Sequence, residues 1–155
     1  MSNPLWDYSL TIYRLDEVAS SCIALQDTFD MDVNLLLYAA WLAHLKCSLS
    51  DDHLAALEAL VSEWREQVVK PLRGLRRQLR DYPGAESARD ELKHLELQAE
   101  REQQDMMYAF YQRSPTVPCC DAALLENLTR VAQRACPGTS DWDTHVRHLA
   151  ALIAP

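Results

Sequence analysis

Residues 25–45 read LQDTFDMDVNLLLYAAWLAHL, a short acidic stretch followed by an almost wholly apolar one. Between residues 33 and 45, apolar side chains fall on nearly every face of a helix instead of forming one stripe. A helix that is apolar all round is buried on all sides. We therefore expect a buried central helix over residues 33–45, with the other elements packed around it.

Three aspartates, Asp27, Asp30 and Asp32, precede this helix. Clustered carboxylates can hold Mg²⁺, which prefers oxygen ligands, but the spacing crosses an apparent helix break at Asp30 and no second cluster of this sort follows. Asp32 stands directly before the apolar run, where a side-chain oxygen caps free backbone N–H groups. Asp27 and Asp30 fit the end of the preceding helix and its turn. We predict capping and turn roles for the aspartates, and no metal site.

The rest of the chain also predicts helices and no strand. The sequence holds only 3 glycines among 155 residues, is rich in strong helix formers and shows no clear alternation of polar and apolar residues. A long helix begins after Ser50 and is interrupted by Pro71, and another covers about residues 85–112. The turn between them, DYPGAES (81–87), is so short that the two helices should form an antiparallel hairpin over about 51–112.

The apolar residues of the first hairpin helix recur at helical spacing and predict its seam: Val61, Trp64, Val68, Leu72, Leu75 and Leu79. Two shorter helices follow, over about 120–136 and 140–153. We predict an all-α fold with one domain over residues 1–155, a helical bundle of six or seven helices. About 5–115 would form the main bundle and about 119–155 the C-terminal helices.

The composition indicates the compartment. The chain has a net charge of −8, five cysteines without C-x-x-C spacing, no long apolar span and no leader-like start. These features favour a cytoplasmic protein with reduced thiols, no membrane contact and no cofactor. For the adjacent Cys119 and Cys120 we expect a packing role, with redox chemistry or soft-metal binding as the alternative.

A cluster of bases lies in the first hairpin helix, where residues 67–80 read QVVKPLRGLRRQLR and include no acid. We call its five bases the basic stripe: Lys70, Arg73, Arg76, Arg77 and Arg80. Most of them are three or four residues apart and so share one helix face. Guanidinium and ammonium groups gathered in this way can bind an acidic partner protein, phosphate or RNA.

The alternative is that the stripe pairs with acids across the hairpin. A turn near Pro83 would create five pairs of opposite charge: Arg80 with Glu86, Arg77 with Asp90, Arg76 with Glu91, Lys70 with Glu96 and Glu66 with Arg101. Flanking pairs of this kind select the register of two helices, but each exposed pair adds only about 0–1 kcal/mol of stability. Both roles can hold together, because a guanidinium group has several donors to share.

Several short strings are more specific than any generic motif: Leu5-Trp6, Cys22, Leu25-Gln26-Asp27, Asp32-Val33-Asn34-Leu35-Leu36, Trp41 and Pro71-Leu72-Arg73. Through these strings, roughly residues 5–80 resemble a proteobacterial family of short proteins of unknown function found in Pseudomonas and Vibrio relatives. The resemblance implies a soluble bacterial helical protein with no assigned reaction, cofactor or catalytic residue.

The sequence contains no phosphate-binding loop, nucleophile elbow or zinc-protease motif. We therefore expect a non-enzymatic protein–protein interaction or adaptor module, in which the basic stripe docks on the acidic surface of a partner. The alternative is a helical enzyme or small-ligand binder with a polar site near Asp27, Asp32 and Asn34, under Tyr38 and Trp41. A second alternative is RNA or ribosome association through the stripe, which the acidic total charge opposes.

Overall fold

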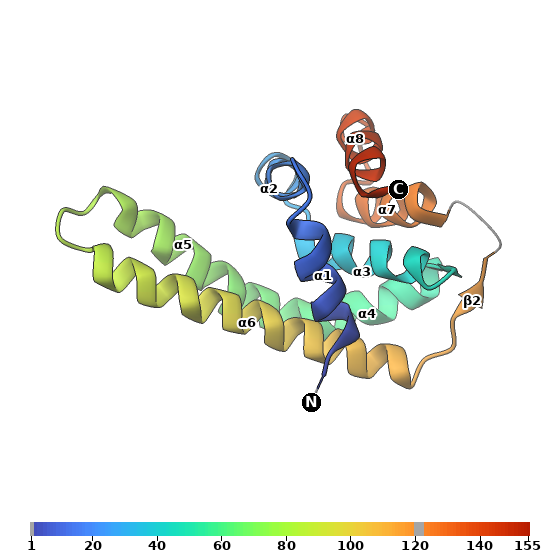
Figure 1. Ribbon diagram of the computed structural model, residues 1–155, viewed down its shortest axis with the longest axis horizontal. Helices are drawn as coiled ribbons and strands as arrows, with labels where there is room; N and C mark the ends of the chain where they lie inside the picture. The colour runs from blue at the N-terminus through green and yellow to red at the C-terminus, as the bar shows by residue number, and fades with distance from the viewer. Residues whose placement is uncertain (1, 120–122) are drawn as a thin grey trace.

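The computed structural model describes residues 2–119 and 123–155, and a buried helix stands at its centre. This helix, α3 (Val33–His44), has every residue from 34 to 42 buried. Four helices contact it directly, α1 (Pro4–Tyr13), α2 (Val18–Phe29), α6 (Glu86–Gln112) and α7 (Ala123–Ala135), and α8 (Asp143–Ile153) packs on α2 and α7. Figure 1 shows this arrangement, which confirms the predicted central helix.

The aspartates before α3 form the boundary between two helices, as predicted. Asp30 ends α2 in the left-handed conformation with φ of 53°, which a short polar side chain tolerates. The Oδ1 atom of Asp32 then accepts the backbone N–H of Asn34 at 2.9 Å and so caps α3. Asp27 lies one turn earlier, on the exposed side of α2. The capping and turn roles of Asp32 and Asp30 are therefore confirmed.

The first hairpin helix runs unbroken through a wide turn before Pro71. α4 (Asp51–Trp64), capped by Ser50, continues through a π-helical turn (Arg65–Val69) into α5 (Lys70–Gln78). Proline lacks an N–H donor, and its ring would clash with the carbonyl one turn earlier, so a widened turn at this point accommodates it. The extra residue rotates the following face, and Val69 is buried in place of the predicted Val68.

The predicted antiparallel hairpin is confirmed. A 3-10 turn (Leu79–Asp81) and Gly84, whose φ of 80° suits a residue without Cβ, reverse the chain into α6 (Glu86–Gln112). The second half of α6 packs on the body, whereas α5 and the first half of α6 project from it (Figure 1). No residue from 70 to 95 is buried. We call residues 75–95 the hairpin end.

One short ladder was not predicted. β1 (Cys47–Ser48) pairs antiparallel with β2 (Val117–Pro118), with Cys47 opposite Pro118. The ladder continues in a 2.8 Å hydrogen bond from the Cys119 N–H to the Lys46 carbonyl. Two-residue strands are too short to show alternation in a sequence. The other half of the predicted cysteine pair, Cys120, lies outside the described residues.

The main hydrophobic core joins the helices of the body. This cluster of buried apolar side chains extends from Leu5 in α1 to Ala150 in α8, and a smaller cluster of Ile12, Leu37 and Ala40 lies beside it. Counting α4, the π turn and α5 as one rod, the described residues form seven helical rods, which agrees with the predicted six or seven in an all-α fold. Among these residues, no helix is both long and apolar enough to span a membrane.

Candidate functional site

Two members of the basic stripe, Lys70 and Arg77, bind aspartates near the boundary of α2 and α3. Lys70 Nζ lies 3.2 Å from Asp30 Oδ1 and 2.9 Å from Glu66 Oε1. Arg77 Nη2 lies 3.0 Å from Asp27 Oδ1. These bases therefore fasten the hairpin to the body, using the same aspartates whose clustering the sequence shows.

The central members of the stripe bind acids of α6. Arg76 Nε lies 2.7 Å from Glu96 Oε2, and Arg73 lies 3.7 Å from Glu96 and 3.5 Å from Glu100. Each of the five predicted pairs is wrong, because none of them forms among the described residues. Helical side chains lean toward the N-terminus of their own helix. Bases on α5 therefore reach toward the body, where they meet acids further along α6.

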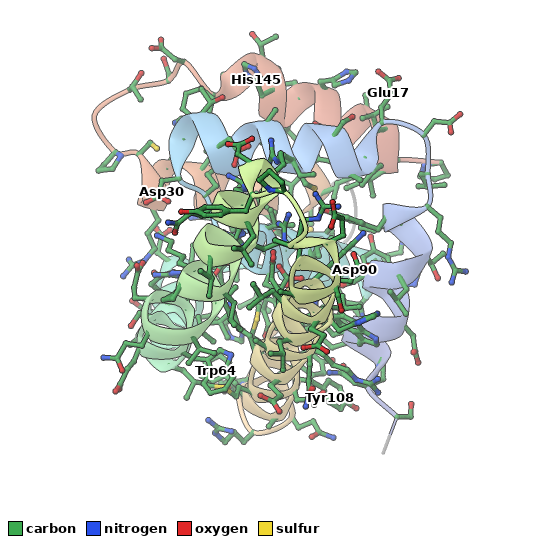
Figure 2. All side chains as sticks on the ribbon, turned by 90° about the vertical axis from the view of Figure 1, so that its left-hand side faces the viewer. Glu17, Asp30, Trp64, Asp90, Tyr108 and His145 are labelled. Carbon is green, nitrogen blue, oxygen red and sulfur yellow. The ribbon has the colours of Figure 1, made fainter. Side chains whose placement is uncertain are left out.

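Beyond these pairs, the hairpin end has a basic cleft of about 320 Å³. Four bases and one acid line this cleft: Arg76, Arg80, Arg89, Lys93 and Asp90. Within the described part of the chain, neither Arg80, Arg89 nor Lys93 forms an ion pair. Figure 2 looks at the molecule from this side, with Asp90 on the near part of α6. Of the predicted stripe, Arg80 is thus the base that stays available.

Large apolar side chains are exposed on the same projection. Leu75 is 46% exposed, Tyr82 58% and Leu95 51%. They lie on α5, at the turn and on α6 of the projecting hairpin. Exposed apolar groups next to unpaired charges are the two ingredients of a protein interface.

The five residues of the predicted ligand site do not converge. Asp27, on the exposed side of α2, forms an ion pair with Arg77 of α5. Tyr38 is fully buried, with its hydroxyl 2.7 Å from His53 Nε2, and Trp41 packs its ring edge on Tyr111 in the core. The remaining two, Asp32 and Asn34, line one pocket.

The carboxylate of Asp32 is occupied by contacts within the protein. Besides capping α3, its Oδ2 atom accepts hydrogen bonds from Arg65 at 3.2 Å and from Gln103 at 2.8 Å. Arg65 also binds Glu58. A wider cleft of about 490 Å³ beside this group is lined mostly by charges that are bound to one another in this way.

The pocket beside Asn34 is small and mixed in character. It measures about 110 Å³ and is formed by α1, α2, α3, α5 and α6, close to where the hairpin leaves the body. We call it the Asn34 pocket. Its charged and polar wall includes Arg73, Glu100 and Tyr13, and its apolar wall includes Leu10 and Leu97.

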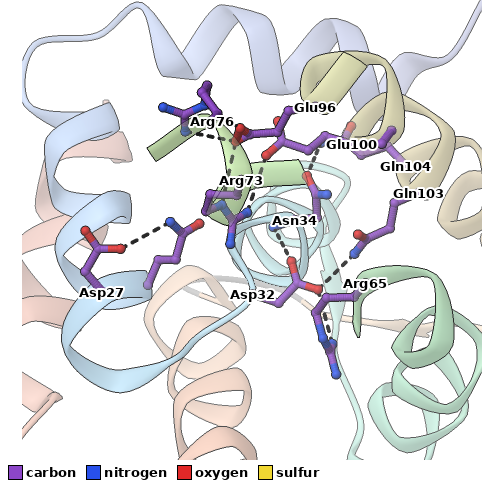
Figure 3. A network of polar contacts seen from close by, with 12 residues as sticks. Asp27, Asp32, Asn34, Arg65, Arg73, Arg76, Glu96, Glu100, Gln103 and Gln104 are labelled. Carbon is purple, nitrogen blue, oxygen red and sulfur yellow. Dashed lines mark hydrogen bonds and ion pairs between the residues drawn. The ribbon is translucent and has the colours of Figure 1, made fainter. Parts of the chain in front are cut away.

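A chain of amides forms the floor of this pocket. Gln104 Nε2 donates to Asn34 Oδ1 and to Ser9 Oγ, both at 3.1 Å. Figure 3 shows these contacts beside the Arg73, Glu96 and Glu100 cluster. Gln104 and Asn34 are both buried, so the hydrogen bonds hold their orientation. The pocket is therefore shaped before any ligand enters it.

Glu100 is the titratable group of the pocket. Burial, together with the neighbouring Glu96 carboxylate, raises the pKa of its carboxyl to about 7, although Arg73 opposes the rise. Burial also raises the pKa of the Tyr13 hydroxyl, and the charges on Cys22 and Glu100 add to that rise. A carboxyl that gains or loses its proton near neutral pH is a common mark of a functional position.

The sequence analysis missed the polar residues Glu100, Tyr13 and Gln104. One signal for Glu100 was present, because Glu96 and Glu100 are one turn apart beside Ala99, on the face of α6 that meets the body. Tyr13 and Gln104 had no such signal. Among the described side chains, no group of three or more His, Cys, Asp or Glu is arranged to hold a metal ion.

The fold and these surfaces define an all-α protein with a projecting hairpin and two binding-type features, a basic cleft and a small polar pocket. The chain belongs to the DUF2390 family, described as a protein of unknown function, and the match covers residues 4–107. The matched part includes the hairpin end and every residue that lines the Asn34 pocket. No curated protein and no solved structure matches the chain.

Proposed function

We propose that this protein is a non-enzymatic docking module that binds an acidic segment of a partner protein at its hairpin end. The observation that carries the proposal is the pairing pattern of the bases. Lys70, Arg73 and Arg77 are bound to the protein's own acids, whereas Arg80, Arg89 and Lys93 around the basic cleft are not. Docking therefore uses the outer part of the predicted stripe, extended by two bases of α6.

The position of the cleft suits contact with another protein. The hairpin end projects from the body, so a partner reaches both helices without meeting other elements (Figure 1). Leu75, Tyr82 and Leu95 lie within it and are exposed. Burying these apolar groups supplies affinity, and the bases select an acidic partner and speed the encounter.

An acidic protein segment suits this surface better than RNA does. Tyr82 is the single aromatic residue of the hairpin end, and single-stranded nucleic acid is bound by several stacking aromatics beside a basic groove. The net charge of −8 also repels a polyanion as it approaches. We place the interaction in a bacterial cytoplasm, because the first half of the chain resembles short proteins of Pseudomonas and Vibrio relatives and the five cysteines fit reduced thiols.

A direct binding experiment tests this proposal. A fluorescein-labelled peptide rich in Glu and Leu is titrated with the protein, and fluorescence anisotropy gives the dissociation constant. The variant Arg80→Glu/Arg89→Glu/Lys93→Glu should weaken binding at least about tenfold, which corresponds to about 1.4 kcal/mol. The control Arg14→Glu/Arg134→Glu/Arg147→Glu makes the same charge change at exposed bases of the body and should have under about twofold effect.

A second experiment locates the contact in cells. A photo-crosslinking amino acid at Tyr82 should capture a protein, and one at Leu15, also exposed but on the body, should not capture the same protein. Capture at Tyr82 should be lost in the Arg80→Glu/Arg89→Glu/Lys93→Glu background. Equal weakening by both charge variants contradicts the proposal, and so does an RNA oligonucleotide that displaces the peptide.

A further inference from the structure

The bases of the basic cleft are spaced so that they repel one another. Arg76 of α5 and Arg80 of the following 3-10 turn are four residues apart, and so are Arg89 and Lys93 of α6. Like charges at this spacing destabilise a helix. All four bases line one cleft, and Asp90 is the one acid that lines it with them. An anion inside the cleft would remove this repulsion.

A buried carboxylate holds one of these bases in place. Glu96 is only 7% exposed, and its two oxygens accept hydrogen bonds from Arg76 Nε at 2.7 Å and from Arg76 Nη2 at 3.1 Å (Figure 3). Over residues 2–119 and 123–155, Arg76 Nη1 donates no hydrogen bond. A planar guanidinium that is fixed along one edge keeps its other donors in a fixed direction. The cleft therefore has an oriented donor before any ligand enters it.

The arrangement of the bases suits a phosphate group better than a carboxylate. Asp90 lines the cleft but forms no ion pair within the described part of the chain, so the bases are not drawn together by it. A carboxylate is planar and offers two oxygens to one guanidinium edge. A phosphate monoester offers three oxygens in different directions and a charge near −2 at neutral pH. It can therefore accept hydrogen bonds from bases of both hairpin helices, across a cleft of about 320 Å³.

We propose that the group that enters the basic cleft is a phosphorylated serine or threonine of the partner protein, an inference that rests on the docking function proposed above. Its phosphate accepts hydrogen bonds from the guanidinium groups of Arg80 and Arg89 and from Arg76 Nη1. The ammonium group of Lys93 adds the remaining positive charge. The phosphate thereby neutralises most of the charge that the cleft holds.

The surroundings of the cleft favour a phosphate carried by a protein. Leu75, Tyr82 and Leu95 are exposed on the same projection, and exposed apolar groups are typical of surfaces that bind other proteins. The net charge of −8 opposes the approach of nucleic acid and of anionic membranes, which are the other carriers of phosphate groups. A short phosphorylated peptide brings a small number of charges and meets less of this repulsion.

Four labelled peptides of one Glu- and Leu-rich sequence test the inference by fluorescence anisotropy. Their central position holds threonine, phosphothreonine, glutamate or two adjacent aspartates, and the last of these matches the charge of the phosphate. The phosphothreonine peptide should bind at least about tenfold more tightly than the threonine peptide and at least about threefold more tightly than the other two. Equal binding of the phosphothreonine and two-aspartate peptides would show that only charge matters and would overturn the inference.

Phosphorus NMR reports on the phosphate itself. The second pKa of the peptide phosphate is near 6 when the peptide is free. Because the bases stabilise the dianion, this pKa should fall by about one unit on binding, which corresponds to about tenfold tighter binding of the dianion than of the monoanion. The Arg80→Glu/Arg89→Glu/Lys93→Glu variant should leave it unchanged. An unchanged phosphate pKa at saturation with the unmodified protein contradicts the proposed contacts.

Two other sources of phosphate serve as competitors. Inorganic phosphate and vesicles that contain phosphatidylglycerol supply the same group without a peptide. Each should displace the phosphothreonine peptide only at concentrations at least about tenfold above those at which the unlabelled phosphothreonine peptide does so. Displacement by either at equal concentration would assign the cleft to free phosphate or to lipid and overturn the choice of a protein.

Matched variants locate the phosphate in the cleft. Asp90→Asn removes the acid of the cleft and should strengthen phosphothreonine binding about two- to fivefold. Glu91→Gln removes the same charge at the next exposed position, which does not line the cleft, and should have a clearly smaller effect. Arg80→Lys/Arg89→Lys keeps the charge but loses the guanidinium fork, so it should reduce the preference for phosphothreonine over two aspartates. Equal effects of Asp90→Asn and Glu91→Gln would contradict binding at this position.

The same titrations separate this inference from the docking function. If the threonine peptide binds through Arg80, Arg89 and Lys93 and phosphorylation adds no affinity, docking stands and the phosphate inference is wrong. If none of the peptides binds, both are wrong.

Discussion

The side chain of Asn127 on α7 accepts the backbone N–H of Leu49 at 2.8 Å, across 78 residues of sequence. Its Nδ2 donates to the carbonyls of Cys47 at 3.0 Å and Ala39 at 3.2 Å. Asn127 is fully buried, so one amide satisfies the backbone of the connection between α3 and α4. It joins the C-terminal helices to the family-matched part of the chain.

Replacing this amide should therefore be costly. Asn127→Ala leaves the Leu49 N–H and the Cys47 carbonyl buried without partners, and each such group costs about 1–3 kcal/mol. We expect a loss of about 2–4 kcal/mol in the free energy of unfolding, measured by urea denaturation. Gln133→Ala, at an exposed position of the same helix, is the control and should change stability by under about 0.5 kcal/mol. Similar losses in both variants would contradict this account.

Asp32 combines a cap with a half-buried ion pair, and two substitutions separate these roles. Asp32→Asn keeps an oxygen for the Asn34 N–H but removes the charge that faces Arg65, whereas Asp32→Ala removes both. A lost cap costs about 1 kcal/mol, and leaving a buried charge without its partner costs more. We expect losses of about 1–2 kcal/mol for Asp32→Asn and about 3 kcal/mol or more for Asp32→Ala in urea denaturation. Equal losses would show that the cap contributes nothing.

Glu100 should make the protein less stable as the pH rises. Its folded-state pKa of about 7 lies above its ordinary value, so the penalty for ionising it is absent below about pH 4.5 and complete above pH 7. Glu100→Gln cannot ionise and removes that penalty, which is about 3 kcal/mol. In urea denaturation, the variant should be more stable than the unmodified protein at pH 8 and nearly equal to it at pH 4.5. A stability difference that is the same at both pH values would contradict the raised pKa.

His53 should resist protonation. Burial lowers its pKa below the ordinary 6.5, although a backbone hydrogen bond at Pro115 opposes the shift. The Tyr38 hydroxyl, 2.7 Å from Nε2, favours the neutral ring when it donates to that atom. An NMR titration should therefore place the His53 pKa below 6.5 and closer to 6.5 in Tyr38→Phe. The folded protein favours the neutral imidazole, whereas His53 of the unfolded chain takes up a proton near pH 6.5. The stability that His53 contributes is therefore lost as the pH falls below 6.5.

The parts of the fold that could be predicted are those that depend on residues close together in the sequence. The apolar run of α3 requires burial whatever surrounds it, and the cap at Asp32 and the reversal at Gly84 depend on local backbone geometry. The π turn before Pro71 could not be predicted in this way, because the regular spacing of an α-helix does not include an inserted residue. That residue moved the buried position from Val68 to Val69.

The candidate sites were predicted less well for the same reason. Arg77 meets Asp27 across 50 residues, and no spacing rule connects them. The Asn34 pocket takes its walls from five helices, so Tyr13 and Glu100 become neighbours only when the hairpin meets α1. Sequence patterns draw attention to the basic stripe and to Asn34, but the contacts of each are set by tertiary packing.

No residue between 70 and 95 is buried, so the core of the protein does not depend on the side chains of this segment. Apart from those of Arg76 and Arg77, which bind Glu96 and Asp27 outside the hairpin end, substitutions at the hairpin end remove no core contact and should leave the free energy of unfolding nearly unchanged. Family members can therefore diverge in binding preference along this projection without first acquiring compensating mutations in the core. For a protein engineer, the same segment is a place where new specificity can be selected from libraries with little loss of folded protein.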